Sequence, residues 1–117
     1  MCGWMFGAVK KMKMTDEQMI DYVACKLPIG ERLAQLAEEA AELAQAALKY
    51  RRSITSGASP TSKTEKDALD NLVEEIEDVK MCIDTLELNC VIPDGEFEKW
   101  RKYKMPRWCE RIKKAGI

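Results

Sequence analysis

Apolar residues recur three or four positions apart through most of the chain, which is the spacing of amphipathic α-helices. This spacing predicts four helices, over residues 16–26, 30–52, 65–89 and 95–115. No stretch shows the alternation of apolar and polar residues that is typical of strands, and no repeat of solenoid length is present. The pattern therefore predicts an all-α fold, a helical bundle of about four helices.

Residues with strong capping or turn preferences mark the ends of these helices. Thr15 precedes two acidic residues and is suited to cap the first helix. Pro28 and Gly30 separate the first helix from the second. A loop rich in Ser and Thr is expected at residues 53–64, and Pro106 is expected to bend or interrupt the last helix.

The length of 117 residues suits one domain with a core of moderate size. We interpret residues 1–14 as an N-terminal extension, which is expected to be flexible, and residues 15–117 as a single domain. Long amphipathic helices in so short a chain would leave apolar surface open in a monomer. We therefore expect a homodimer or homotetramer, in which association completes the bundle.

Charge is nearly balanced, with a formal net charge of −1. Such a balance gives no global field that would attract a nucleic acid polymer or an anionic membrane, so neither is expected as a partner. Basic residues nevertheless gather in residues 98–114, well in excess of the two glutamates there. Any binding of phosphate groups would therefore be local.

Five cysteines are present, and none forms a C-x-x-C pair. An odd number cannot pair completely within one chain, so we interpret the cysteines as reduced thiols in the cytoplasm. The first residues are apolar before they are basic, which is the reverse of a secretory signal, and the uncharged stretch is too short to span a membrane. The expected location is cytoplasmic.

Acidic residues form a pair three positions apart on each of the two long predicted helices. On the second helix Glu39 and Glu42 lie at about 240° and 180° from the apolar stripe, with Glu38 at about 140°. On the third helix Glu75 and Asp78 take the same two angular positions, at about 240° and 180°. The two pairs are thus displaced in the same sense and could face one cavity.

A divalent cation would offset the repulsion between such like charges, because it accepts several carboxylate oxygens. The chain has no histidine, which disfavours a di-iron bundle or a zinc site. Ligation by oxygen alone favours Mg2+, with Mn2+ as an alternative. The competing interpretation is that these glutamates form a solvated helix face and bind nothing.

The segments EEAAE at 38–42 and EEIED at 74–78 resemble the E-E-x-x-E and E-x-x-D signature of MazG-like nucleoside triphosphate pyrophosphohydrolases. The likeness to this all-α superfamily extends over roughly residues 30–111. It implies an oligomeric helical enzyme that hydrolyses a nucleoside triphosphate to a monophosphate and pyrophosphate. It also implies a catalytic set in which Glu38 has a supporting role and the Mg2+ ligands are Glu39, Glu42, Glu75 and Asp78.

The segment KMPRWCER at 104–111 resembles the family's C-terminal K-x-x-R-W-x-x-R stretch. It implies phosphate-binding roles for Lys104, Arg107 and Arg111, and a hydrolase for a polyanionic substrate does need cations besides its metal. Gln35 lies on the side of Glu39 and could contact the base or sugar. The chain departs from the family in the longer segment 43–74 between the acidic motifs and in the proline within the basic stretch.

Two other functions fit the same residues. One is a non-catalytic helical interaction module, in which the acidic face keeps an oligomer soluble. The other is hydrolysis of phosphoribosyl-ATP, which belongs to the same superfamily and would use the same carboxylates. A metal-dependent nucleotide hydrolase is the function that the sequence favours.

Overall fold

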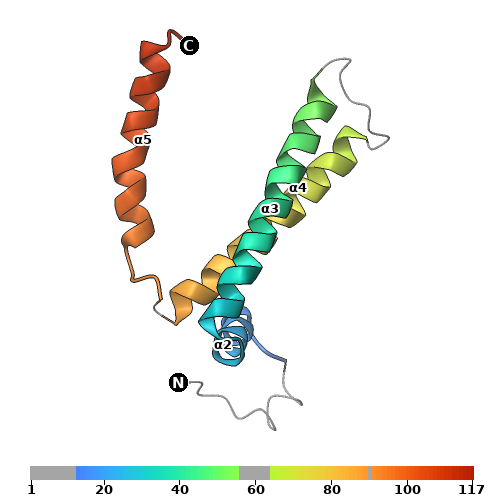
Figure 1. Cartoon of the computed structure of the whole chain (residues 1–117), viewed down its shortest axis with the longest axis vertical. Coiled ribbons are helices and arrows are strands. Elements are labelled where there is room, and N and C mark those ends of the chain that lie inside the picture. Colours follow the sequence, from blue (N-terminus) through green and yellow to red (C-terminus); the bar gives the residue numbers. More distant parts are fainter. Residues whose placement is uncertain (1–12, 56–63, 90) are drawn as a thin grey trace.

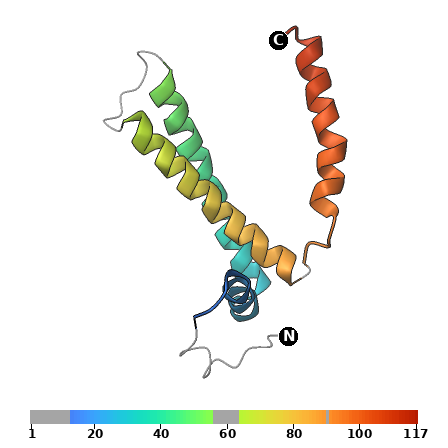
Figure 2. The same ribbon diagram turned by 180° about the vertical axis from the view of Figure 1, so that it is seen from behind.

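The computed structural model describes residues 13–55, 64–89 and 91–117, and its secondary structure is entirely helical there. The helices are α2 (Asp16–Lys26), α3 (Ile29–Ile54), α4 (Glu65–Leu88) and α5 (Glu96–Lys114). Helices α3 and α4 run antiparallel and side by side, while α2 packs against α4 (Figure 1 and Figure 2). The prediction of an all-α fold with four helices is confirmed.

Local capping residues fix where three of the helices begin. The backbone N–H of Gln18 donates to Thr15 Oγ1 at 3.1 Å, and the N–H of Thr15 donates to the Gln18 side chain at 2.8 Å. This reciprocal pair is a capping box, and it confirms Thr15 as the predicted cap of the first helix. Thr64 caps α4 by accepting from the N–H of Asp67. Gly95 precedes α5 with φ of 82°, which glycine reaches without strain.

The structure differs from the predicted helices chiefly at the end of α3 and at Pro106, while the other ends agree to within one residue. Helix α3 continues to Ile54, so the segment expected as a loop from residue 53 begins as helix, and residues 56–63 lie outside the described residues. Helix α5 continues through Pro106, where an interruption was expected. Proline costs one backbone hydrogen bond, but on a fully exposed helix water can replace the missing donor. Almost all of the expected N-terminal extension lies outside the described residues.

Helices α3 and α4 pack together through side chains that are alternately four and three residues apart, as in a coiled coil. We call this helix–helix contact the α3–α4 seam. On α3 its buried and half-buried side chains belong to Arg32, Leu36, Glu39, Leu43, Ala46 and Tyr50. On α4 they belong to Ala68, Leu72, Glu75, Val79, Cys82 and Leu86. Only 1% of Ala46 and 3% of Ala68 are exposed, because these small side chains let the two helices approach closely.

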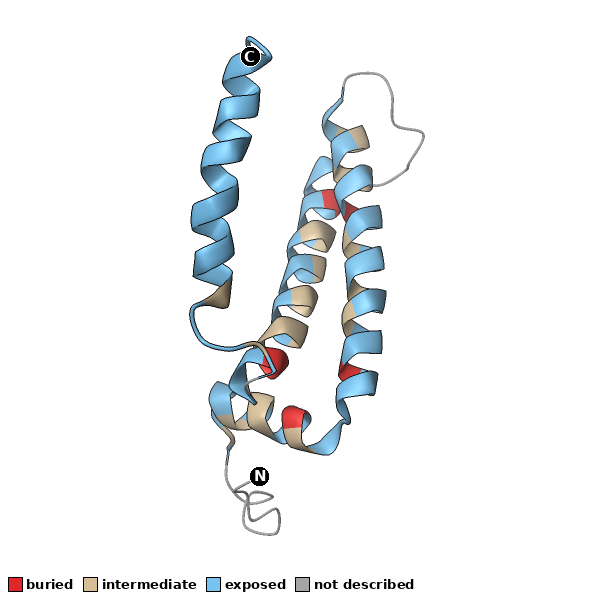
Figure 3. Cartoon of the chain, turned by 60° about the vertical axis from the view of Figure 1, so that its left-hand side comes forward, coloured by how far each residue is buried: buried red, intermediate tan, exposed pale blue. Residues whose placement is uncertain are grey.

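The apolar stripe that the sequence pattern marks on α3 lies mostly outside this seam. Leu33 and Leu48 remain 48% and 52% exposed, and Ala40 and Ala44 are exposed as well. Helix α4 likewise leaves Val73 57% exposed. Helix α3 therefore has two apolar faces, and a single chain supplies a packing partner for only one of them. Figure 3 shows that much of α3 is coloured as exposed.

Arg32 ties three helices together at one end of the seam. It is buried, its Nε donates to the backbone oxygen of Leu27 at 3.0 Å, and its Nη1 donates to that of Thr85 at 2.9 Å. Leu27 is the C-cap of α2, and Thr85 lies in the last turn of α4. The guanidinium therefore satisfies carbonyls at two helix C-termini, where the helix dipole favours a positive charge.

Helix α5 stands apart from the other three helices, and every one of its residues after Glu96 is exposed (Figure 1 and Figure 2). Its exposed side chains include Trp100 and Trp108, with 51% and 60% of their surface open. None of the described helices has the length and apolar character that a membrane span requires. The packed unit of the single chain is thus made of α2, α3 and α4.

The cysteines differ from the sequence-based interpretation in one respect. Cys25 is disulfide-bonded, whereas Cys82 and Cys109 are free thiols. The expectation of uniformly reduced cysteines is therefore wrong for Cys25. Sequence spacing could not show this pairing, because disulfide partners are set by proximity in space rather than by separation along the chain.

The substitution Arg32→Leu should destabilise the fold by about 2 to 4 kcal/mol, because it removes charge-assisted donors from a part-buried carbonyl at Leu27 and a buried carbonyl at Thr85. Urea unfolding of the wild type and the variant measures the difference. Arg51→Leu, on the exposed surface of the same helix, is the matched control and should change stability by no more than about 0.5 kcal/mol. Equal effects of the two substitutions would contradict the role given to Arg32.

Candidate metal centre

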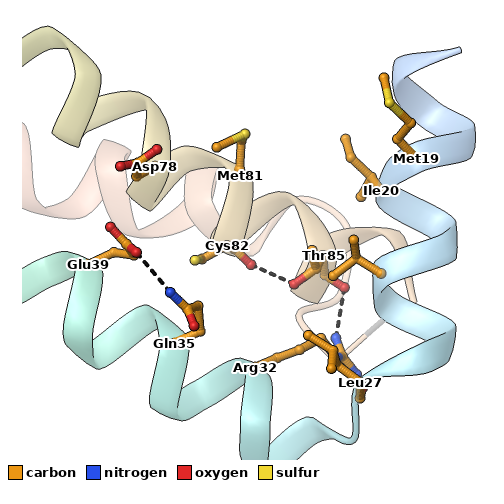
Figure 4. Close-up of a pocket in the computed structure, with 11 residues that line it drawn as sticks. Met19, Ile20, Leu27, Arg32, Gln35, Glu39, Asp78, Met81, Cys82 and Thr85 are labelled. Atoms are coloured by element: carbon orange, nitrogen blue, oxygen red, sulfur yellow. Dashed lines mark hydrogen bonds between the residues drawn. The ribbon is translucent and has the colours of Figure 1, made fainter.

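Three carboxylates from two helices meet between α3 and α4. One oxygen from each of Glu39, Glu75 and Asp78 lies within 4.8 Å of the others, and we call these residues the carboxylate cluster. Glu39 comes from α3 and the other two come from α4. Figure 4 shows Glu39 and Asp78 facing one another across the space between their helices. The predicted convergence of the two acidic pairs is thus observed for three of the four proposed ligands.

The cluster lies in the packed seam rather than on a solvated helix face. All three side chains are half-buried. Oε2 of Glu39 and Oε2 of Glu75 are withdrawn from solvent and lack a hydrogen-bond partner within the described chain. Buried carboxylate oxygens are normally paired, because desolvation of an ionised group is costly. Two such oxygens beside a third carboxylate indicate a place where a cation would bind favourably.

The electrostatics of the cluster agree with this geometry. Burial raises the pKa of Glu39. The hydrogen bond from Gln35 lowers this pKa because it favours the ionised form, whereas the negative charges of Glu42 and Asp78 raise it further. Burial also raises the pKa of Glu75, and the neighbouring charges of Glu42 and Asp78 add to it. Both groups therefore ionise less readily than they would in water, and a bound cation would reverse the effect.

The remaining acidic candidates differ in how closely they approach the cluster. Glu42 is exposed and outside the group of three, but its charge raises the pKa of both Glu39 and Glu75, so it lies beside them. Glu38 is also exposed and has no place in the cluster, in agreement with its different angular position on the helix. Four acidic side chains thus gather at this point of the seam.

Gln35 connects the cluster with a neighbouring cavity. Its Nε2 donates to Oε1 of Glu39 at 2.8 Å. A cavity of about 300 Å³ lies between α2, α3 and α4, and Gln35, Glu39 and Asp78 all contribute to its wall (Figure 4). The side chain expected to contact a base or sugar therefore does lie at a cavity beside the carboxylates.

The basic residues on α5 do not reach the cluster within one chain. Lys104, Arg107 and Arg111 are exposed on a helix that stands apart from α3 and α4 (Figure 2). Arg107 lies 5.0 Å from the ring centroid of Tyr103, and Lys104 lies 5.8 Å from that of Trp100. These cation–π contacts orient the basic side chains on α5 itself. The single chain therefore does not assemble the predicted phosphate-binding group with the predicted metal ligands.

Sequence reasoning missed two residues that shape the site. Cys82 lines the cavity, and burial, with the charges of Glu39 and Asp78, raises the pKa of its thiol. Arg32 also lines the cavity while it holds the ends of α2 and α4. One feature of the sequence could have revealed the position of Arg32. Residues 32, 36, 39 and 43 are alternately four and three positions apart, and this coiled-coil spacing places an arginine and a glutamate on the same face of the helix as two leucines.

The geometry of the cluster suits a hard divalent cation. In octahedral coordination with bonds of about 2.1 Å, two ligand oxygens lie about 3.0 Å apart when adjacent and about 4.2 Å apart when opposite. The three oxygens lie within 4.8 Å of one another, so the side chains would have to move closer together to bind one ion. The donors are all carboxylate oxygens, the ligands that Mg2+ and Mn2+ prefer. The residues present therefore fit the predicted metal.

Comparison with known proteins adds no relative: no protein-family model, curated protein or solved structure matches the chain.

Glu75→Gln should raise the thermal midpoint of the metal-free protein at pH 8. The folded-state pKa of Glu75 is raised above its ordinary value of 4.5, so ionisation opposes folding once the pH exceeds that raised pKa. Below pH 4.5 the carboxyl is protonated in both folded and unfolded states, and the stabilising effect of the substitution should disappear. Thermal melting in EDTA across this pH range measures the effect.

Glu77→Gln is the matched control, because Glu77 is an exposed neighbour that pairs with Lys80 at 3.5 Å. It should not raise the midpoint at pH 8. A Glu75→Gln variant that melts below the wild type at pH 8 would show that the carboxylate stabilises the metal-free fold, contrary to the electrostatic account.

Proposed function

We propose that this protein is a Mg2+-dependent pyrophosphohydrolase that converts a (deoxy)nucleoside triphosphate and water into a nucleoside monophosphate and pyrophosphate. The observation that carries the proposal is the carboxylate cluster, which brings together residues from both halves of the motif that resembles the MazG-like signature. A solvated acidic face would not place two unpaired carboxylate oxygens within a helix seam.

Each carboxylate has a role in this proposal. Glu39, Glu75 and Asp78 would hold the metal. Glu42, which is exposed and lies beside the cluster, would either serve as a fourth ligand or orient the attacking water. Bound Mg2+ would neutralise phosphate charge and lower the pKa of a coordinated water. Glu38 would act indirectly by supporting this group. The water oxygen would bond to the α-phosphorus while the bond from that phosphorus to the bridging oxygen breaks, pyrophosphate would leave, and the proton lost by the water would pass to a neighbouring carboxylate.

We also propose that the active form is a homodimer or homotetramer. The radius of gyration is 18.9 Å, whereas a compact domain of this length would have about 13 Å. Helix α4 carries nine acidic and two basic residues, and α5 carries three acidic and eight basic residues. Charge complementarity thus favours contact between α5 of one copy and α4 of another, and this contact would supply cations to the cluster.

Sedimentation that shows only monomer at micromolar concentration would contradict this assembly.

A non-catalytic interaction module remains the second candidate, and the exposed apolar faces of α3 and α4 favour it. The two functions differ in their response to ligand. A hydrolase should gain thermal stability from Mg2+ with nucleotide, because the ligand binds only the folded state, whereas the module should show no shift.

Wild-type protein should release pyrophosphate from at least one member of a panel of nucleoside and deoxynucleoside triphosphates in the presence of Mg2+. Glu75→Gln should lower kcat/KM by about 100-fold or more, because a metal ligand is lost. Separation of the products by anion exchange identifies the monophosphate and pyrophosphate.

Glu77→Gln, which removes one carboxylate from the same turn of α4 without touching the cluster, should leave the rate near that of wild type. The proposal fails if no nucleotide is hydrolysed. It also fails if the two Gln variants lose activity to the same extent.

A further inference from the structure

Glu39 is the member of the carboxylate cluster that must reach across the seam. Glu75 and Asp78 lie three residues apart on α4, so the backbone of that helix fixes their spacing. Glu39 comes from α3 and faces Asp78 across the space between the two helices (Figure 4). The position of its carboxylate relative to the other two therefore depends on the rotatable bonds of its own side chain. Ordering such a side chain costs conformational entropy unless a neighbour already restrains it.

The restraint comes from Gln35, one turn earlier on α3. Side chains four residues apart are neighbours on a helix surface, and Nε2 of Gln35 donates to Oε1 of Glu39 at 2.8 Å (Figure 4). An ionised carboxylate can only accept hydrogen bonds, so the amide nitrogen is the atom that must face it. The length of 2.8 Å is typical of a hydrogen bond to a charged group. Gln35 therefore holds the ionised form of Glu39 in one orientation.

This hydrogen bond leaves the second oxygen of Glu39 for a cation. Oε2 of Glu39 is withdrawn from solvent and lacks a hydrogen-bond partner within the described chain, whereas Oε1 is occupied by Gln35. Carboxylates that bind a metal are commonly hydrogen-bonded by a neighbouring group, and loss of that neighbour typically lowers metal affinity by about 10- to 100-fold. The contact between Gln35 and Glu39 has this form.

Gln35 contributes little to the packing of the fold. Its side chain is exposed, and it lies at the wall of the cavity rather than in the α3–α4 seam. Binding of one ion requires the cluster oxygens, which lie within 4.8 Å of one another, to move closer together. An exposed side chain has room to follow such a movement and keep its hydrogen bond. Support of Glu39 and stability of the fold are thus separable at this residue.

We propose that Gln35 is a positioning residue, which acts through Glu39 and sets the direction of its carboxylate for binding of the divalent cation. This inference rests on the metal site of the proposed function and adds a residue to it. It gives Gln35 a task that differs from the contact with a base or sugar expected from the sequence. In this role Gln35 itself does not touch the cation.

Mn2+ titration of a Gln35→Met variant tests the role directly. Methionine is close to glutamine in length and helix propensity but has no N–H group, so the variant removes the donor and little else. Its dissociation constant for Mn2+, measured by electron paramagnetic resonance, should be about tenfold or more above that of the wild type. Gln45→Met, at another exposed position of the same helix, is the matched control and should bind Mn2+ as the wild type does.

A second comparison separates positioning from a general effect on the fold. In EDTA the two Met variants should unfold at nearly the same urea concentration as the wild type, because both positions are exposed. In a Glu39→Gln background, where the carboxylate that Gln35 holds is missing, Gln35→Met should weaken Mn2+ binding no further. Where Glu39→Gln binds too little Mn2+ for this comparison, the affinities of the two single Met variants decide the question.

The outcomes separate this inference from the proposed function. Mn2+ binding by the wild type with equal affinity in Gln35→Met would overturn the positioning role and leave the metal site intact. An equal loss of affinity in Gln35→Met and Gln45→Met would also overturn it, as would a further loss in the Glu39→Gln background or a urea midpoint of Gln35→Met well below that of Gln45→Met. Absence of Mn2+ binding by the wild type would refute the metal site of the proposed function, and this inference with it.

Discussion

Repulsion between like charges inside a packed helix interface is the constraint on which the account of this structure depends. The α3–α4 seam is otherwise formed mainly by apolar side chains, yet Glu39 and Glu75 occupy positions within it and Asp78 joins them. Burial raises the pKa of both glutamates, so their ionised forms oppose folding unless a cation compensates. A protein without use for the cluster would be more stable with neutral residues there.

The rest of the packed unit holds this unfavourable group in place. Small alanines let α3 and α4 approach at one end of the seam, and Arg32 fixes the ends of α2 and α4 at the other. Since Arg32 also lines the cavity, the interaction that sets the position of α2 sets the cavity wall as well. The carboxylate cluster and the cavity are thus held by the same three packed helices, α2, α3 and α4. Metal ligands need such rigid support to stay in position.

Sequence periodicity predicted the four helices and the approach of Glu39 to Glu75 and Asp78, because both follow from the 3.6-residue repeat and from capping residues such as Thr15. The fourth predicted ligand, Glu42, is exposed and lies outside the cluster. Periodicity did not identify the seam. Helix α3 has two apolar faces, and periodicity gives no reason to prefer the face with Glu39 over the face with Leu33. The position of α5 and the buried position of Arg32 depend on distant parts of the chain, which local patterns do not encode.

Direct titration with Mn2+ tests the central claim that the seam carboxylates bind a divalent cation, because bound Mn2+ loses the sharp electron paramagnetic resonance signal of the free ion. We expect wild-type protein and Glu77→Gln to remove that signal in a saturable manner. The double variant Glu39→Gln, Glu75→Gln should leave it unchanged. Equal Mn2+ binding by the double variant and the wild type, or no binding by either, would contradict the account.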